Sequence, residues 1–179
     1  PFAANAGPNV LFKSTFESGS PTFEGEGWTA NYSGAPWDTT LLSNATVKPH
    51  HGLYHAYFKV NSGSGVREAY AYKYIGDGLH LVFTRIYVCF LDVPDEGKLY
   101  YCLAHKSGDP GVSHTQAAVG IKNDSGTLKW ALYSSNLTGS VLSLASSGPA
   151  LNTYYAVELK TYVNGSYTLG TDEDRLYVD

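Results

Sequence analysis

The chain has 179 residues, of which 43% are hydrophobic and only 16% are charged, and its net charge is −4. A chain of this length can bury ~70% of its unfolded surface around one core, so the composition argues against an intrinsically disordered protein. The absence of a Lys/Arg cluster argues against nucleic acid as a partner, and the absence of any run of ~18 apolar residues argues against a membrane span.

Short runs of strand-forming residues, separated by turn-forming residues, follow one another along the chain, and no sustained helical period is present. The predicted strands are 10–12, 53–60, 66–75, 79–93, 98–105, 115–122, 127–133, 140–144, 154–163 and 175–178. Strands of this number and spacing predict an all-β fold, a two-sheet antiparallel jelly-roll sandwich. We expect an extended N-terminal segment at residues 1–9 and one jelly-roll domain at residues 10–179.

The predicted strands 79–93 and 98–105 form the strongest hairpin candidate, because a turn-forming segment separates them. If Asp95 and Glu96 are at the tip of the turn, Cys89 lies opposite Cys102, and these are the only two cysteines of the chain. We therefore predict a disulfide between them, worth ~2–3 kcal/mol in the chain-entropy model. Two buried free thiols are the alternative.

The same register divides the side chains of the hairpin between two faces. The apolar face, which suits the core between the sheets, holds Ile86, Val88, Phe90, Tyr101, Leu103 and His105. The opposite face holds Arg85, Tyr87 and Tyr100. Trp130, between Leu128 and Leu132 on a later strand, is also expected in the core.

Five of the nine Asn residues begin an Asn-x-Ser/Thr glycosylation acceptor, whereas chance predicts roughly one or two. The acceptors are Asn31, Asn44, Asn123, Asn136 and Asn164. This excess indicates a secreted glycoprotein, located extracellularly or at a cell surface. Coincidence in a surface rich in Ser and Thr is the alternative.

A succession of short stretches along the chain forms a recognisable pattern. The stretches are 11–19 (Leu-Phe-Lys-Ser-Thr-Phe-Glu-Ser-Gly), 49–56 (Pro-His-His-Gly-Leu-Tyr-His-Ala), 67–70, 85–87, 119–121, 130–133, 154–159 and 176–179. In this order they resemble the laminin-G-like and concanavalin A-like lectin group of extracellular domains. The resemblance implies two antiparallel sheets, one of them concave, and often carbohydrate binding. Such domains usually continue past the final Tyr-Val-Asp, so it also implies that C-terminal return strands are lacking here.

No complete glycosidase or lyase motif is present, so we predict a non-catalytic protein with no assigned cofactor. The acidic run Asp172-Glu173-Asp174 is typical of a solvated turn, and Glu24 and Glu26 lie in a loop-like stretch. The doublet His50-His51 cannot place both rings on one face of a strand, which argues against zinc. A structural calcium ion, common in this fold class, stays an alternative without an assigned set of ligands.

Sugar binding needs aromatic platforms accompanied by a few fixed polar groups. Tyr70, Tyr72 and Tyr74 alternate along one predicted strand and therefore share a face. Arg85, Tyr87 and Tyr100 share a face of the predicted hairpin, and Trp37 is expected in an exposed loop. On the late strand, Tyr154, Glu158, Lys160 and Tyr162 are expected opposite Tyr155, Val157 and Leu159.

These surfaces lead to the hypothesis of an extracellular lectin-like module that binds a polysaccharide or surface glycan on a Tyr-lined concave sheet. Packing of the Tyr rings against one another is the structural alternative. Two other functions stay open. One is an N-glycosylated subunit of a filament or surface layer, assembled with other copies of itself by strand complementation. The other is a module of a carbohydrate-active enzyme.

Overall fold

The computed structural model describes residues 12–14, 16–17, 23–30, 37–43, 48–52, 54–60, 69–76, 79, 81–106, 115–136, 139–162 and 175–178. In these residues the regular structure consists of antiparallel strands and one short 3-10 helix, so the predicted all-β fold with two antiparallel sheets is confirmed. None of the described helical residues form a segment long and apolar enough to cross a membrane. The chain divides into two compact units, unit 1 (Pro1–Asp77) and unit 2 (Gly78–Asp179).

Unit 1 contains two small antiparallel pairs of strands. The first joins β1 (Thr29–Ala30) to β4 (Ala71–Tyr72), and the second joins β2 (Trp37–Ser43) to β3 (Tyr54–Val60). The 3-10 helix η1 (Glu24–Glu26) precedes β1. Sequence analysis predicted β3 but missed β1 and β2, and β4 occupies only two residues of the strand expected at 66–75.

Two of the stretches that carry the lectin resemblance come together in unit 1. The Glu17 carboxylate accepts a hydrogen bond of 3.0 Å from the backbone N–H of Tyr54. Gly52 lies directly against this carboxylate, has φ +72°, and has no room for a Cβ atom. Phe23 is 1% exposed, and its ring packs against the rings of Phe16 and Phe58.

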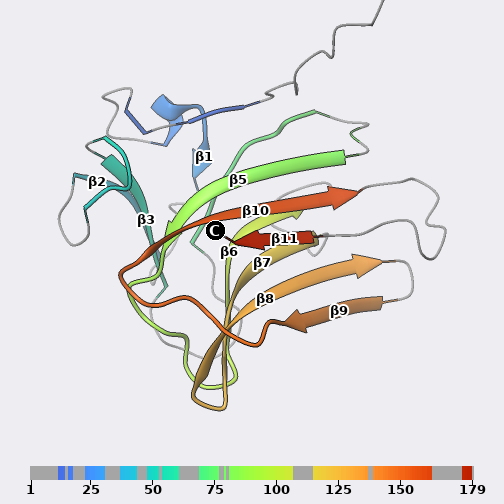
Figure 1. Cartoon of the computed structure of the whole chain (residues 1–179). Coiled ribbons are helices and arrows are strands. Elements are labelled where there is room, and N and C mark those ends of the chain that lie inside the picture. The colour runs from blue at the N-terminus through green and yellow to red at the C-terminus, as the bar shows by residue number, and fades with distance from the viewer. Residues whose placement is uncertain are drawn as a thin grey trace, which may run out of the picture. The chain divides into compact units, whose positions relative to one another are not determined.

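Unit 2 contains two antiparallel sheets (Figure 1). The three-stranded sheet has the order β11-β10-β5, with β5 (Leu81–Cys89), β10 (Tyr154–Tyr162) and β11 (Arg175–Val178). The four-stranded sheet has the order β6-β7-β8-β9, with β6 (Leu99–Lys106), β7 (Thr115–Asp124), β8 (Thr127–Asn136) and β9 (Gly139–Leu144).

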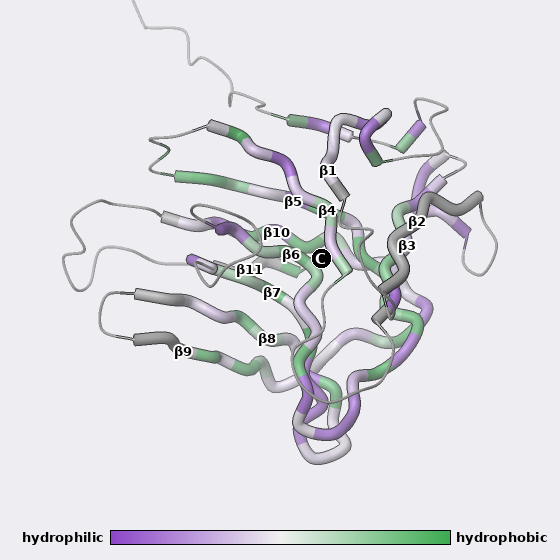
Figure 2. Tube along the Cα trace, turned by 180° about the vertical axis from the view of Figure 1, so that it is seen from behind, coloured by the Kyte–Doolittle hydropathy of each residue, from purple (hydrophilic) through white to green (hydrophobic). Residues whose placement is uncertain are grey.

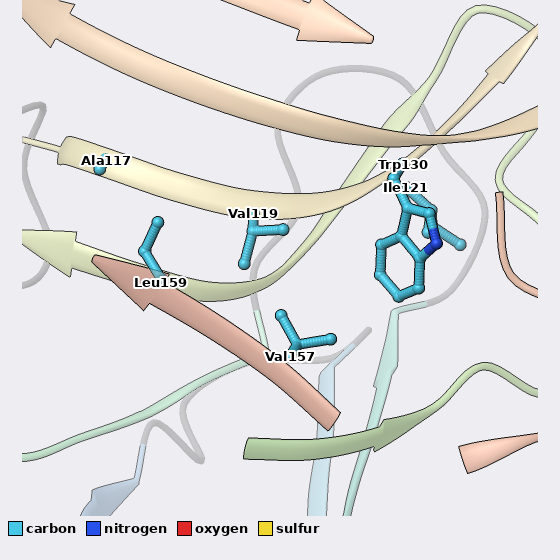
Figure 3. Packing of buried hydrophobic residues seen from close by; sticks show 6 residues of the cluster. All are labelled: Ala117, Val119, Ile121, Trp130, Val157 and Leu159. Carbon is cyan, nitrogen blue, oxygen red and sulfur yellow. The ribbon is translucent and has the colours of Figure 1, made fainter. Parts of the chain in front are cut away.

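The core of unit 2 lies between these sheets. Hydropathy changes repeatedly along the strands (Figure 2), and burial alternates from residue to residue along β5, so one side of that strand turns inward. Val157 and Leu159 of β10 pack against side chains of the four-stranded sheet, and the three aliphatic ones labelled there, Ala117, Val119 and Ile121, are fully buried (Figure 3). The buried cluster is Ala117, Val119, Ile121, Trp130, Val157 and Leu159. The core position predicted for Trp130 is confirmed, with 6% of the residue exposed.

The predicted hairpin between 79–93 and 98–105 is wrong. β5 pairs with β10, β6 pairs with β7, and the segment between β5 and β6 connects the two sheets. The predicted inward face of β5 is retained, because Ile86, Val88 and Phe90 pack against the buried cluster. Leu103 of β6 packs against the same cluster, but from the other sheet and not as a neighbour of β5.

The predicted disulfide is also wrong, because Cys89 and Cys102 are free thiols. Cys89 ends β5, opposite Tyr154 in the three-stranded sheet. Cys102 belongs to the four-stranded sheet, where its Sγ lies 3.4 Å from the Val119 carbonyl oxygen. The pairing of β5 with β10 therefore places the two cysteines in different sheets.

A β-bulge on β6 changes the face that Tyr101 occupies. Tyr101 pairs with Gly120 and Leu103 pairs with Val119, so Cys102 is an extra residue without a register partner. Leu103 packs against the buried cluster as predicted, but Tyr101 is 47% exposed, on the other side of the sheet. The expected core position of Tyr101 is wrong, because a bulge interrupts strict alternation.

His105 joins the two sheets through a polar bridge. Its Nε2 lies 2.7 Å from Thr84 Oγ1 on β5, and its Nδ1 lies 2.6 Å from Thr161 Oγ1 on β10. Thr161 is 2% exposed, and burial lowers the pKa of His105 to about 4. A neutral imidazole has one N–H donor and one acceptor nitrogen, so the two hydroxyls satisfy both ring nitrogens.

The first prediction concerns the two thiols. Unfolding in the absence of a reductant should allow alkylation of both cysteines, seen as two adducts by mass spectrometry. In the native protein we expect Cys102 to react far more slowly than Cys89, because burial raises the pKa of Cys102 to about 12. A Cys89→Ser variant isolates the slow site. If the unfolded, unreduced protein takes up no adduct, Cys89 and Cys102 form a disulfide and the free thiols are contradicted.

The second prediction concerns pH. The pKa of His105 is about 4 in the folded chain against 6.5 for an ordinary His, so the unfolded chain binds this proton more tightly. The stabilising contribution is therefore complete above pH 6.5 and is lost as the pH falls towards 4, by on the order of 3 kcal/mol. Urea unfolding at pH 7.5 and pH 4.5 measures this loss of unfolding free energy, in the unaltered protein and in a His105→Gln variant. Removing exposed His51 is the control, and an unchanged pH slope in His105→Gln would contradict the assignment.

Candidate functional site

The candidate site is the outer face of the three-stranded sheet, defined as the side of β5 and β10 turned away from the core of unit 2. Burial of Val157 and Leu159 places alternate residues of β10 on this face. Cross-strand neighbours on it are Phe83 with Lys160, Arg85 with Glu158, and Tyr87 with Ala156. The face predicted for the late strand, with Glu158 and Lys160 opposite Val157 and Leu159, is confirmed.

Two aromatic side chains are exposed along β5 on this face. Phe83 is 57% exposed and Tyr87 is 48% exposed. Arg85 lies between them on the same side of the strand, because residues two apart share a face. Exposed rings of this size, four residues apart on one side of a strand, can contact an apolar ligand surface, and we call Phe83 and Tyr87 the aromatic platform.

Two charged side chains of β10 interact with this row of β5, Glu158 with Arg85 and Lys160 with the Phe83 ring. Arg85 Nε donates to Glu158 Oε2 at 3.1 Å, with 61% of the Arg85 side chain and 27% of the Glu158 side chain exposed. Lys160 Nζ lies 6.0 Å from the centroid of the Phe83 ring, within cation–π range. Exposed ion pairs contribute only ~0–1 kcal/mol to stability. Their main effect here is to fix the positions of the charges beside the rings.

β11 pairs with β10 and adds a third strand to this sheet. Arg175 is the partner of Lys160, and Tyr177 is the partner of Glu158. The side chains of β11 residues 175–177 lie outside the described residues. The backbone pairing thus places Arg175 and Tyr177 in register with Lys160 and Glu158.

The structure separates the residues predicted to bind glycan. Arg85 and Tyr87 lie together as expected, but Tyr100 is on β6 in the four-stranded sheet. Burial, together with the charges of Asp95 and Asp92, raises the pKa of Tyr100. Tyr100 therefore lies close to the acidic connection between β5 and β6, and the expected face shared by Arg85, Tyr87 and Tyr100 is wrong.

The remaining predicted aromatic residues belong to unit 1. Tyr72 is 36% exposed and Tyr74 is 67% exposed, and the Tyr70 and Tyr72 rings lie 6.3 Å apart between centroids. Trp37 is the first residue of β2, opposite Val60, and not a loop residue as predicted. The Trp37 side chain lies outside the description.

Sequence reasoning missed Phe83 and did not pair Arg85 with Glu158. Phe83 precedes Arg85 and Tyr87 at the same spacing of two residues, so alternation along the predicted strand was a sufficient signal. The Arg85–Glu158 pair had no local signal, because the two residues are 73 positions apart.

The outer face of the four-stranded sheet has a different character. The Tyr101 and Tyr133 rings meet edge to face, with centroids 6.1 Å apart, above the small residues Ala118 and Gly120. A Cβ atom at Gly120 would collide with the backbone of Tyr100, which explains the glycine. On this face the two Tyr rings pack against each other, which is the alternative to sugar binding given above.

Sequence analysis considered two acidic stretches, around Glu24 and at 172–174, as catalytic carboxylates. No group of three or more His, Cys, Asp or Glu in those residues could hold a metal ion. The acidic run 172–174 lies outside them. Glu26 is in η1, where its Oε2 accepts a hydrogen bond from Ser14 at 3.2 Å.

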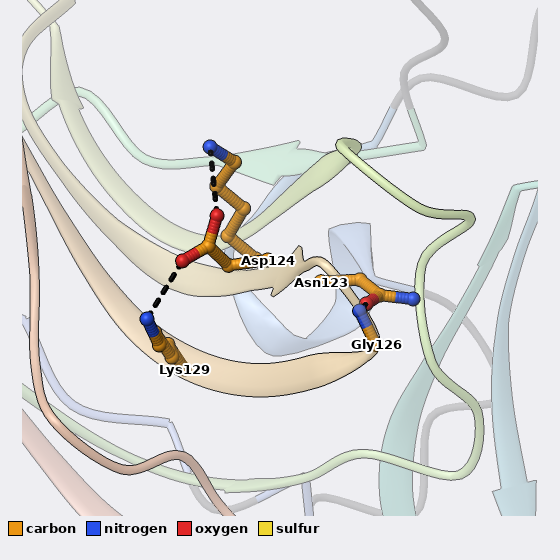
Figure 4. Close-up of polar contacts among 5 residues, drawn as sticks. Asn123, Asp124, Gly126 and Lys129 are labelled. Atoms are coloured by element: carbon orange, nitrogen blue, oxygen red, sulfur yellow. Dashed lines mark hydrogen bonds and ion pairs between the residues drawn. The ribbon is translucent and has the colours of Figure 1, made fainter.

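Asn123 is the one predicted acceptor whose side chain is described, and it supports a turn. Its Oδ1 accepts from the Gly126 N–H at 3.0 Å in the β7–β8 turn (Figure 4), and its Nδ2 donates to the Pro94 carbonyl at 3.0 Å. In the same turn Asp124 pairs with Lys129 at 2.6 Å and Lys122 at 3.9 Å. Asn136 ends β8, with its side chain undescribed, and Asn31, Asn44 and Asn164 lie outside the described residues.

The third prediction tests the role of Asn123. An Asn123→Ala variant loses both hydrogen bonds, so its unfolding free energy should fall by ~1–3 kcal/mol in denaturant melts. Ser125→Ala removes the same acceptor motif while retaining the Asn123 side chain. The Ser125→Ala variant should lose much less unfolding free energy than Asn123→Ala, in glycosylated and in unglycosylated protein. Equal losses in the two variants, confined to glycosylated protein, would show that a glycan is responsible.

Comparison with known proteins adds no family assignment to this geometry. The chain matches no protein-family model, no curated protein and no solved structure at a significant level. The arrangement of residues on the sheets is therefore the basis for the function proposed below.

Proposed function

We propose that this protein is a non-catalytic carbohydrate-binding module that holds a polysaccharide on the outer face of its three-stranded sheet. The observation that carries the proposal is the row of Phe83, Arg85 and Tyr87 along one side of β5. Both rings are about half exposed, and Glu158 from the neighbouring strand fixes the cation between them.

The chemistry of this row suits a sugar chain. Pyranose rings present apolar C–H faces that pack on aromatic side chains, while their hydroxyl groups need donors and acceptors at fixed positions. The Arg85–Glu158 pair places N–H donors and carboxylate acceptors beside the rings. Because both partners stand on neighbouring strands of one sheet, the polar groups are held before a ligand arrives.

The length of the row favours an extended ligand. Residues four apart along a strand are separated by ~13–14 Å, so Phe83 and Tyr87 can contact different sugar residues of one chain. A single monosaccharide would contact only part of this row. The ligand we propose is therefore a polysaccharide. A secreted location for the protein agrees with the excess of glycosylation acceptors.

The fourth prediction tests the aromatic platform. In a Phe83→Ala/Tyr87→Ala double variant, polysaccharide affinity should fall at least about tenfold, since each ring contributes on the order of 1 kcal/mol or more to stacking. Affinity electrophoresis against a polysaccharide panel, followed by titration calorimetry, measures the change. Circular dichroism melts confirm that the variant folds.

The control is a Tyr101→Ala/Leu142→Ala double variant, which removes exposed apolar groups from the four-stranded sheet. It should bind as the unaltered protein does. The proposal fails if the unaltered protein binds no polysaccharide, or if both double variants lose affinity to the same degree.

A further inference from the structure

The described charged side chains on the outer face of the three-stranded sheet are two cations and one carboxylate, although the whole chain is acidic. The chain contains 12 Lys and Arg against 16 Asp and Glu. Among the described side chains of this face, Arg85 and Lys160 stand beside a single carboxylate, Glu158. A local excess of positive charge favours the approach of an anionic ligand.

The other described carboxylates of unit 2 lie elsewhere. Asp92, Asp95 and Glu96 are in the connection between β5 and β6. Asp124 is in the β7–β8 turn, where Lys122 and Lys129 pair with it. Among the described residues of unit 2, Glu158 is therefore the carboxylate that shares a face with Arg85 and Lys160.

The two cations of the face remain accessible to a ligand. The Arg85 side chain is 61% exposed, and the ion pair engages its Nε, whereas a guanidinium carries five N–H donors in all. Lys160 places its ammonium near the Phe83 ring. A sugar stacked on Phe83 would hold an acidic substituent within reach of that ammonium.

We infer that the ligand of this face is an acidic polysaccharide, one with carboxylate or sulfate groups along its chain. The inference rests on the proposed function and adds its substrate class. Aromatic side chains supply contact with any sugar ring, while Arg85 and Lys160 select sugars that carry negative charge. The Arg85–Glu158 pair limits the attraction, so the stacking contact remains necessary for binding.

The fifth prediction compares matched pairs of polymers on the full chain. Polygalacturonate should bind at least about tenfold more tightly than its carboxyl-reduced form, and dextran sulfate more tightly than dextran, because charge-assisted hydrogen bonds are lost in the neutral polymers. The pair that shows the larger ratio identifies the preferred acidic group. Affinity for the acidic polymers should fall as salt rises from 50 to 200 mM.

Variants locate the effect on the face. Lys160→Gln should weaken binding of the acidic polymer about five- to tenfold and leave any binding of the neutral polymer unchanged, and Lys160→Arg should restore affinity. Lys98→Gln removes one charge next to the start of β6 and should have no comparable effect.

The outcomes separate the two proposals. Equal binding of charged and neutral polymers, independent of salt, would overturn the acidic preference while the carbohydrate-binding function stands. Binding of no polymer would overturn both. Tighter binding of a single-stranded oligonucleotide than of any polysaccharide would show that the face responds to negative charge in general and would overturn the inference. An equal loss in Lys98→Gln would show that the attraction is not confined to this face and would overturn it too.

Discussion

The packing of β10 against β7 is the contact on which the rest of unit 2 depends. Val157 and Leu159 on one strand, and Val119 and Ile121 on the other, are fully removed from solvent. Burial of such side chains stabilises each by ~1.5–3 kcal/mol, so this contact orients the two sheets. Because β5 is the neighbour of β10, β5 must belong to the sheet opposite β6. The connection between β5 and β6 therefore crosses from one sheet to the other, and the cysteines do not meet.

The core is not uniformly apolar, and its polar part adds specificity. His105 reaches from β6 to hydroxyl groups on both β5 and β10. Apolar contacts tolerate small shifts of one sheet over the other, but hydrogen bonds require matched positions of donor and acceptor. The Thr84–His105–Thr161 bridge thus fixes the relative position of the sheets, at the cost of making the fold sensitive to protonation of the imidazole.

The candidate binding surface follows from the same burial. When Val157 and Leu159 enter the core, strand alternation places Glu158 and Lys160 on the outer face. When Ile86 and Val88 enter from β5, Phe83, Arg85 and Tyr87 take the outer positions. The antiparallel register then sets Arg85 opposite Glu158 and Phe83 opposite Lys160. Core packing thus preorganises the charged and aromatic groups that we propose contact a sugar chain.

Residue patterns alone predicted where most strands of unit 2 lie and which side of β5 and β10 turns inward, because these properties depend on local composition and on alternation between neighbours. Strand pairing was decided only by the tertiary structure, since it joins residues such as Arg85 and Glu158 that are 73 positions apart. The bulge at Cys102 also had no local signal, and it reversed the face of Tyr101. Local chemistry sets the direction of each side chain, but the free energy of burying whole sheets selects the partner of each strand.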